Sequence, residues 1–295
     1  MARLLFKDTF HRGMAFTDLV ENRSGVIAVD ATNTVYGGGV YDGHFNIDPV
    51  HDVNAIFRCY AIPAMHPDPK DVLVIGLSSG SWAQILANDP QVENVTIVEI
   101  NPGYLSLIRK RPEIASLLVN PKVKIVIDDG RRWLVAHPDR KFDFILMNTS
   151  FNWRANMSNL LSVEFLELIR RHMKPGGIEY YNTTWSGDAL LTGATVCPYA
   201  LRIGNFLAVS DHPIAFDKER LRAVLSTYRI DGRAIFDLTK PEERSALERI
   251  VSLPSTYGWD DNGKLVPVVE ERTSLLQRFK GMRLITDNNM GTEWR

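Results

Sequence analysis

One stretch of the sequence decides the fold: Asp71-Val72-Leu73-Val74-Ile75-Gly76-Leu77-Ser78-Ser79-Gly80-Ser81-Trp82. The four apolar residues after Asp71, three of them β-branched, are typical of a buried strand in a parallel sheet. A glycine turn, 76–80, comes next, and a helix is expected to start at Trp82. A strand, a glycine turn and a helix in this order place backbone N–H groups at a helix N-terminus, which favours an anionic or polar ligand group there.

A second apolar run indicates what kind of ligand this is. Residues 95–100 are predicted to form another buried strand, and the carboxylate of Glu99 stands near its end. In nucleotide-binding folds, an acid about 20 residues after the glycines accepts hydrogen bonds from both ribose hydroxyls. Glu99 lies at about this spacing, so we expect it to bind a ribose.

Composition and charge limit the possible functions. The chain has 295 residues, and its 34 Lys and Arg against 35 Asp and Glu argue against a nucleic-acid binder with a broad basic face. Cys59 and Cys197 are too few for a disulfide scaffold or a zinc cluster, and they favour a reducing, cytoplasmic compartment. A charge precedes any signal-peptide core, and no apolar run approaches the roughly 20 residues of a membrane span. We therefore expect a soluble chain without a metal, a membrane contact or a nucleic-acid partner.

Strand and helix patterns alternate after residue 71. This predicts an α/β fold with a Rossmann-like, doubly wound and mostly parallel sheet. Further strands are expected at 123–127, 142–148, 178–182 and 206–210, and helices at 163–173, 217–228 and 241–251. Ser162 is expected to cap the first of these helices.

The residues before this alternation form a small β-rich segment. The runs 16–21 and 25–30 flank a hairpin turn, and 63–69 is expected to be a proline-punctuated linker. The predicted units are an N-terminal β segment (1–62), a nucleoside-binding catalytic domain (63–252) and a C-terminal extension (253–295).

Glycines and polar residues follow the predicted strands at the carboxyl edge of the sheet, which is where an open α/β sheet binds its ligands. They are Gly76, Gly80, Glu99, Asp128, Asp129 and Asn148. Asp129 suits the exocyclic amine of an adenine. A NAD-binding fold would account for Gly76, Gly80 and Glu99 but gives Asp129 no task. The alternative without a ligand is that these acids cap helices or lie in solvent.

Three features carry a resemblance to a known family: the strand residues Val98-Glu99-Ile100, the turn Asp129-Gly130-Arg131, and the N-terminal Tyr41-Asp42-Gly43. Over about 16–210 the chain resembles the spermidine synthase family, which are polyamine aminopropyltransferases with the class I S-adenosylmethionine methyltransferase fold. The resemblance implies S-adenosylmethionine, or its decarboxylated form, as co-substrate. The nucleoside-binding residues it implies are Gly76, Ser79, Gly80, Glu99, Asp128, Asp129 and Gly130. The catalytic residues it implies are Tyr41, Asn148 and Phe151.

Several positions depart from the family pattern. Ser79 replaces an Asp that holds the donor's amine, and Asn148 replaces an Asp that orients or deprotonates the attacking amine. Phe151 replaces a second acid, which holds the far ammonium of putrescine, and Ile56-Phe57-Arg58 stands where a Tyr-His-Glu run is expected. Asparagine cannot take a proton at neutral pH, and an ammonium is costly to place against an apolar wall. Plain putrescine is therefore not expected as the acceptor.

The departure at Ser79 also bears on the donor. Intact S-adenosylmethionine carries a carboxylate, which suits a serine and free N–H groups better than an aspartate. We predict an aminopropyltransferase-like transferase that acts on a small amine or other small nucleophile, as a homodimer. Some relatives with similar 148–156 and 286–294 segments are fused to membrane segments. Two alternatives are a small-molecule methyltransferase and a non-catalytic nucleoside-binding module.

Overall fold

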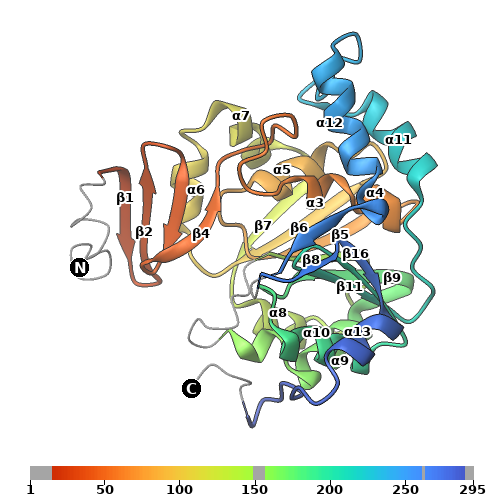
Figure 1. Cartoon of the computed structure of the whole chain (residues 1–295). Coiled ribbons are helices and arrows are strands. Elements are labelled where there is room, and N and C mark those ends of the chain that lie inside the picture. Colours follow the sequence, from red (N-terminus) through yellow and green to blue (C-terminus); the bar gives the residue numbers. More distant parts are fainter. Residues whose placement is uncertain (1–14, 149–156, 261–262, 290–295) are drawn as a thin grey trace.

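The computed structural model describes residues 15–148, 157–260 and 263–289. A large sheet forms its centre (Figure 1), and this sheet has eight strands. The strand order is β16-β10-β11-β9-β8-β5-β6-β7. Five strands are parallel: β5 (Asp71–Ile75), β6 (Asn94–Glu99), β7 (Val123–Ile127), β8 (Phe142–Met147) and β9 (Met173–Asn182). Antiparallel strands extend one edge: β11 (Phe206–Ser210), β10 (Tyr199–Ile203) and β16 (Val269–Glu271). The predicted α/β fold with a mostly parallel sheet is confirmed.

Strand β5 occupies the position where the order of the strands reverses. It pairs with β6 on one side and with β8 on the other, and the chain continues outward from both neighbours. Ligands of open α/β sheets bind at such a reversal, outside the carboxyl ends of the strands. The turn that follows Ile75 therefore lies where a ligand site is expected.

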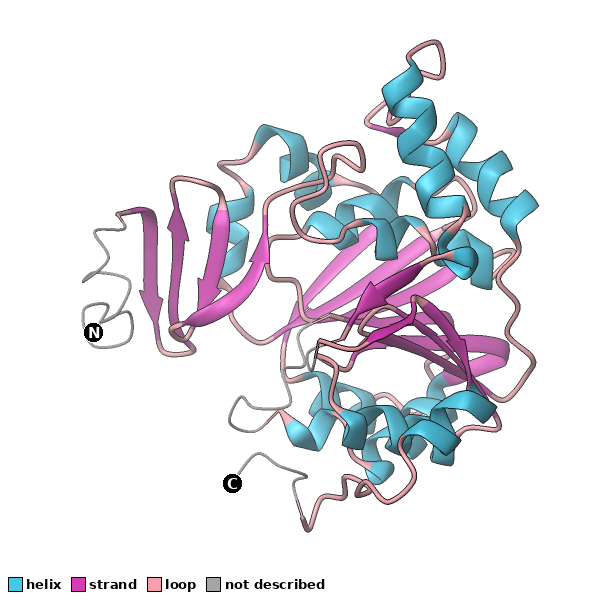
Figure 2. Ribbon diagram, in the orientation of Figure 1, coloured by secondary structure: helices cyan, strands magenta, loops and turns pink. Residues whose placement is uncertain are grey.

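Helices cover both faces of the sheet, as Figure 2 shows. Val72 and Val74 pack into one apolar cluster, under α5, α6, α11 and α12, whereas Leu73 and Ile75 pack into a second cluster, under α8, α9, α10 and α13. This alternation follows from the two-residue period of a strand. The helices of the first face are α5 (Ser81–Asn88), α6 (Gly103–Ile108), α11 (Lys218–Thr227) and α12 (Pro241–Val251). Those of the second are α8 (Gly130–Ala136), α9 (Val163–His172), α10 (Gly187–Val196) and α13 (Arg272–Arg278).

A second, four-stranded antiparallel sheet lies beside the main sheet (Figure 1). Its strands are β1 (Phe16–Asn22), β2 (Gly25–Asp30), β3 (Thr34–Gly37) and β4 (Val40–His44), which confirms the predicted hairpin. The Asn22 amide donates to Asn101 Oδ1 over 2.8 Å, and Asp18 forms ion pairs with Lys110 and Arg111. These contacts dock β1 on α6, so the small sheet forms a wall beside the carboxyl edge of the main sheet.

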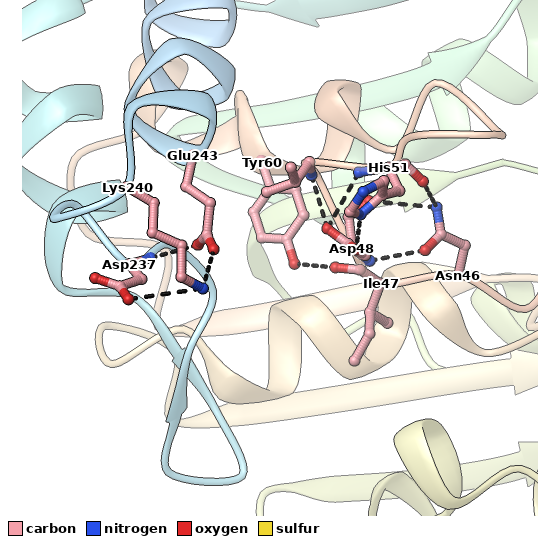
Figure 3. A network of polar contacts seen from close by, with 9 residues as sticks. Asn46, Ile47, Asp48, His51, Tyr60, Asp237, Lys240 and Glu243 are labelled. Carbon is pink, nitrogen blue, oxygen red and sulfur yellow. Dashed lines mark hydrogen bonds and ion pairs between the residues drawn. The ribbon is translucent and has the colours of Figure 1, made fainter.

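The segment between the two sheets is held by its own polar side chains (Figure 3). Asp48 Oδ1 accepts the backbone N–H of Val50 over 2.7 Å, and Asp48 Oδ2 lies 2.8 Å from His51 Nδ1. The hydroxyl of Tyr60 donates to the carbonyl of Ile47 over 2.6 Å. Figure 3 also shows the start of α12, where Lys240 lies between Asp237 and Glu243. The connection to the small sheet is therefore an ordered loop.

The stretch expected to be a linker is partly helical. Residues Ile62–Met65 form α4, and all four are buried. Proline at the first turn of a helix loses no hydrogen bond, so Pro63 is compatible with α4. The predicted domain boundary after residue 62 falls inside this helix.

The region after residue 252 contributes to the main sheet through β16, which pairs with β10. Shorter elements complete the chain: α3 (Phe57–Tyr60), α7 (Pro112–Ala115), η1 (Ser116–Val119), η2 (Ser158–Leu160), β12 (Arg229–Ile230), β13 (Arg233–Ala234), η3 (Leu253–Ser255), β14 (Tyr257–Trp259) and β15 (Leu265–Pro267). Within the described ranges, no helix has the length and apolar character needed to cross a membrane.

Candidate functional site

A cavity of about 550 Å³ opens at the carboxyl edge of the main sheet, against the small sheet. The turns after β1 and β3 line one side, and the ends of β5, β6 and β7 line the other. Five of the residues predicted to bind the nucleoside line this cavity: Gly76, Glu99, Asp128, Asp129 and Gly130. Strands that are adjacent in the sheet thus bring together side chains that are up to 54 positions apart, from residue 76 to residue 130.

Glu99 is the most buried acid of the cavity, with 3% of its surface exposed. Its Oε2 accepts the N–H of Leu77 over 2.6 Å, and its Oε1 accepts the N–H of Asn101 over 2.7 Å. Burial raises the pKa of Glu99 to about 7, while these backbone hydrogen bonds oppose the rise. A carboxylate has about four lone-pair sites, so each oxygen can still accept a ligand hydroxyl.

The two aspartates after β7 have different partners. Asp128 forms an ion pair with Arg132, which lowers the pKa of the Asp128 carboxyl. Asp129 caps α8, because its Oδ1 accepts the N–H of Arg132 over 2.8 Å. Its Oδ2 has no hydrogen-bond partner within the described ranges. One oxygen of Asp129 thus caps a helix, as the alternative without a ligand expects, and the predicted contact with an adenine amine stays a prediction for the other oxygen.

Gly130 lies at the first position of α8, directly against β5. A Cβ placed on it would come within 2.6 Å of Ile75 Cγ2. Real Cβ contacts are never this short, so only glycine allows α8 to begin this close to the end of β5. The close approach brings the start of α8 to the wall of the cavity.

A much smaller cavity, of about 20 Å³, adjoins the first. The two share Asp42, Gly76 and Ser78, and the small one is also lined by Ser79 and Asn148. Ser79 is buried, and its hydroxyl lies 3.0 Å from the hydroxyl of Ser81 in the first turn of α5. The predicted residues of the donor's tail and of the acceptor therefore meet at this small cavity, next to the larger one.

Asn148 takes part in a chain of side-chain amides. The Nδ2 of Asn182 donates to Asn148 Oδ1 over 3.4 Å, and the Nδ2 of Asn205 donates to Asn182 Oδ1 over 2.9 Å. Arg58 ends the chain by donating from its NH1 group to Asn205 Oδ1. Phe151, the other residue predicted on the acceptor side, lies outside the described residues.

The remaining predicted residues, Tyr41 and Gly80, line neither cavity. Tyr41 is 40% exposed and donates its hydroxyl to Asn54 Oδ1. Gly80 precedes α5 with a φ of 78°, and a Cβ there would meet Ile108 Cδ1 at 2.9 Å. Gly80 thus allows the turn after β5 to pack closely against α6.

Asp42 is a cavity residue that the sequence reasoning did not select. It is 8% exposed and lines both cavities, and Tyr104 donates its hydroxyl to Asp42 Oδ2. Its negative charge is one of the influences that raise the pKa of Glu99, although a smaller one than burial. The available signal was its place beside Tyr41 in the Tyr41-Asp42-Gly43 motif.

Two other features have no part in this site. A cavity of about 770 Å³ lies between the ordered loop 47–51 and the β12–β13 hairpin, and none of the predicted site residues lines it. Within the described ranges, no group of three or more His, Cys, Asp or Glu side chains is placed to hold a metal ion.

Part of the sequence matches known proteins. Residues 61–196 match the family model of the spermine/spermidine synthase domain. The polyamine aminopropyltransferase of Mycobacterium tuberculosis is 34% identical over 159 residues, which cover 49% of this chain and 30% of that protein. That of Desulforudis audaxviator is 30% identical over 126 residues, which cover 40% of this chain and 45% of that protein. The matched region thus spans less than half the length of each of these relatives.

Solved structures with similar folds match more of the chain. A spermidine synthase in complex with the transition state analogue AdoDATO has a TM-score of 0.62 at 17% identity, over 81% of this chain and 86% of that chain. The spermidine synthase from Thermotoga maritima has a TM-score of 0.56 at 17% identity, over 81% of this chain and 85% of that chain. At this identity the likeness shows the fold.

Proposed function

We propose that the chain, a member of the spermidine synthase-like family, transfers an aminopropyl-type group from an S-adenosylmethionine-type donor to a small amine. The observation that carries this proposal is the position of Glu99. Its carboxylate lies at the end of β6 in a cavity of about 550 Å³, beside the turn that follows β5. This is where a doubly wound fold binds the ribose of a nucleoside.

The other residues of the cavity support the same orientation of the donor. With the ribose on Glu99, Asp129 Oδ2 is available to the amine of the adenine, beyond the end of β7. The opposite end of the nucleoside then extends past Gly76 toward the small cavity, which Ser79 and Asn148 line. The reacting carbon of the donor would lie between the two cavities, close to Asn148.

The proposed reaction is an in-line displacement at carbon. The nitrogen lone pair of a neutral amine forms a C–N bond, and the electrons of the C–S bond return to the sulfonium. The donor leaves as a neutral thioether, and the extra proton on nitrogen passes to water. Alignment of nitrogen, carbon and sulfur is the main requirement, since holding reactants in line supplies much of the rate gain.

Incubation with each donor and a panel of amines, followed by mass analysis, tests the proposal. Transfer of an aminopropyl or aminocarboxypropyl group to an amine would support it. Transfer of methyl would indicate a methyltransferase instead. Binding of methylthioadenosine, measured by calorimetry, tests the nucleoside site separately, and failure of this ligand to bind would contradict the assignment of Glu99.

A second candidate function is a nucleoside-binding module without catalysis. It is favoured by Asn148, which follows β8, because its amide cannot take a proton from an attacking amine. Tight binding of methylthioadenosine with no transfer to any acceptor would support this alternative. We also propose that the chain forms a homodimer, which light scattering of the purified chain would test. Its proposed location is the cytoplasm.

A further inference from the structure

The amide chain that ends at Asn148 has a direction, and Arg58 sets it. A guanidinium only donates hydrogen bonds, so Asn205 must turn its Oδ1 toward Arg58 and its Nδ2 toward Asn182. The backbone N–H of Thr184 also donates to Asn182 Oδ1, over 2.8 Å, which sets the same orientation independently. The Nδ2 of Asn182 therefore faces Asn148 Oδ1 and donates to one of its two lone pairs, which fixes the orientation of the Asn148 amide.

The consequence is that Asn148 offers its NH₂ group to a ligand. An aspartate at the end of the same strand would offer only acceptors. Trp82, whose indole carries another donor, also lines the small cavity. Its Nε1 is buried and has no hydrogen-bond partner within the described ranges, and an indole N–H only donates.

The charge behind these donors is positive. Arg58 is 8% exposed, and its guanidinium carbon lies 4.7 Å from the ring centre of Phe206 and 5.6 Å from that of Trp82. Its hydrogen bonds go to uncharged oxygens, those of Asn205 and of the backbone carbonyls of residues 54 and 55. No carboxylate of the described residues lies within ion-pair distance of it.

Two acids lie nearby, and each has other partners. Asp52 accepts the backbone N–H groups of Asn54, Ile56 and Phe57. Asp42 lies on the wall that the two cavities share, where Tyr104 donates to it. The Asn148 amide in the small cavity is thus connected through two further amides to a buried cation that has no counter-ion among the described residues.

We propose that the small cavity binds a carboxylate, held by Asn148 Nδ2 and positioned by Arg58. The proposal rests on the proposed function and specifies its substrate class. The volume of about 20 Å³ suits the end group of a ligand, since a single water needs about 10–15 Å³. Two sources have the required chemistry: the amino-acid end of an intact S-adenosylmethionine donor, and an acceptor that is itself an amino acid.

Two matched ligand pairs distinguish these sources in the full chain. S-adenosylmethionine and its decarboxylated form differ only in the carboxylate of the donor. Ornithine and putrescine differ only in the carboxylate of the acceptor, and are measured with and without saturating methylthioadenosine. We expect the carboxylate-bearing member of one pair to bind at least about tenfold more tightly, because hydrogen bonds to a charged group are worth more than neutral ones.

Variants identify the residues responsible. Arg58→Met should reduce the preference to less than about threefold, and Arg58→Lys should restore part of it. Asn148→Asp keeps the shape of the side chain but replaces the NH₂ donor by an anion, so it should reverse the preference even if Arg58→Met does not fold. Arg222→Met is the matched control, since Arg222 is a surface residue paired with Glu219 and Glu248.

The outcomes separate this proposal from the proposed function. Methylthioadenosine binding without a preference in either pair would overturn the carboxylate site and leave the nucleoside site intact. A preference for ornithine without methylthioadenosine binding would support the carboxylate site alone. A preference that survives both Arg58→Met and Asn148→Asp would overturn the assignment to these residues.

Discussion

Glu99 combines a raised pKa with a proposed role, ribose binding, that requires its charged form. Burial raises its pKa to about 7, whereas ribose hydroxyls donate best to a carboxylate. We therefore expect methylthioadenosine to bind more tightly as the pH rises through about 7, and binding at pH 6 to release a proton. Calorimetry at pH 6 in two buffers of different ionisation enthalpy would measure this release. An affinity independent of pH between 5.5 and 8 would contradict it.

The same residue affects stability in the opposite direction. Its pKa in the folded chain lies above the ordinary value of 4.5, so the folded chain holds its proton more tightly than the unfolded chain. The free energy of unfolding should therefore fall by about 3 kcal/mol as the pH rises from 4.5 through about 7. In Glu99→Gln, the free energy of unfolding measured by urea titration should depend less on pH. The variant should also bind methylthioadenosine more weakly, by about 1.5–3 kcal/mol.

Ser79 is the residue whose substitution should change the choice of donor. It is buried, lines the small cavity and brings no negative charge to the place where we propose that the tail of the donor lies. Ser79→Asp should shift the preference toward decarboxylated S-adenosylmethionine, because its ammonium gains an acid and the intact donor's carboxylate meets a like charge. Competition binding with both donors would measure the shift. Ser79→Asn, which adds similar bulk without charge, is the control, and an equal shift in both variants would exclude an electrostatic cause.

The start of α8 requires glycine, a residue without a side chain, at position 130. Gly130→Ala would place a Cβ within 2.6 Å of Ile75 Cγ2, so α8 or the end of β5 must move. Such overpacking typically costs about 1–3 kcal/mol of stability. Here it should also weaken the binding of methylthioadenosine, because both elements line the cavity. Gly258→Ala is a suitable control, since a Cβ there would be 3.5 Å from Val268 Cγ2. Urea denaturation and calorimetry of both variants would test this, and equal behaviour would contradict it.

The elements that could be predicted from sequence are those whose cause is local. The β5–turn–α5 unit follows from an apolar run and two glycines, and the cap of α9 follows from Ser162, whose hydroxyl accepts the N–H of Phe165. Helix α4 was missed because a proline at a helix start has the same pattern as a proline in a linker. Strand β16 has only three residues, and its pairing with β10 depends on contacts about 68 positions away in the chain.

The residues of the candidate site were also predictable only where their placement has a local cause. Positions after the strands were predictable, because parallel strands end at one edge. Asp42 was not, since its role depends on Tyr104, which lies 62 positions later in the chain. The role of Arg58 was equally hidden. It depends on Asn205, 147 positions away, and on the direction that three amides share.

The C-terminal region is joined to the main sheet by a buried ion pair. Arg202 in β10 is fully buried, and its Nε donates to Glu270 Oε2 in β16 over 3.0 Å. Glu270 also accepts from Arg278 over 2.8 Å and from Ser274 over 2.7 Å. Arg202 further donates to the carbonyl of Pro267. Three elements, β10, β16 and α13, therefore share one charged cluster.

Removing one partner should destabilise the whole chain rather than release its C-terminal region. Glu270→Ala leaves Arg202 buried without a counter-ion, which typically costs about 3–5 kcal/mol. The double variant Arg202→Met with Glu270→Leu removes the fully buried charge together with its partner and should be clearly more stable than Glu270→Ala. Arg278 also loses its partner, but its side chain is 19% exposed and its charge can be hydrated. Thermal unfolding should show a single transition for each variant, because β16 is part of the same sheet as β5. A separate low-temperature transition for the C-terminal region, or equal stability of the single and double variants, would contradict this account.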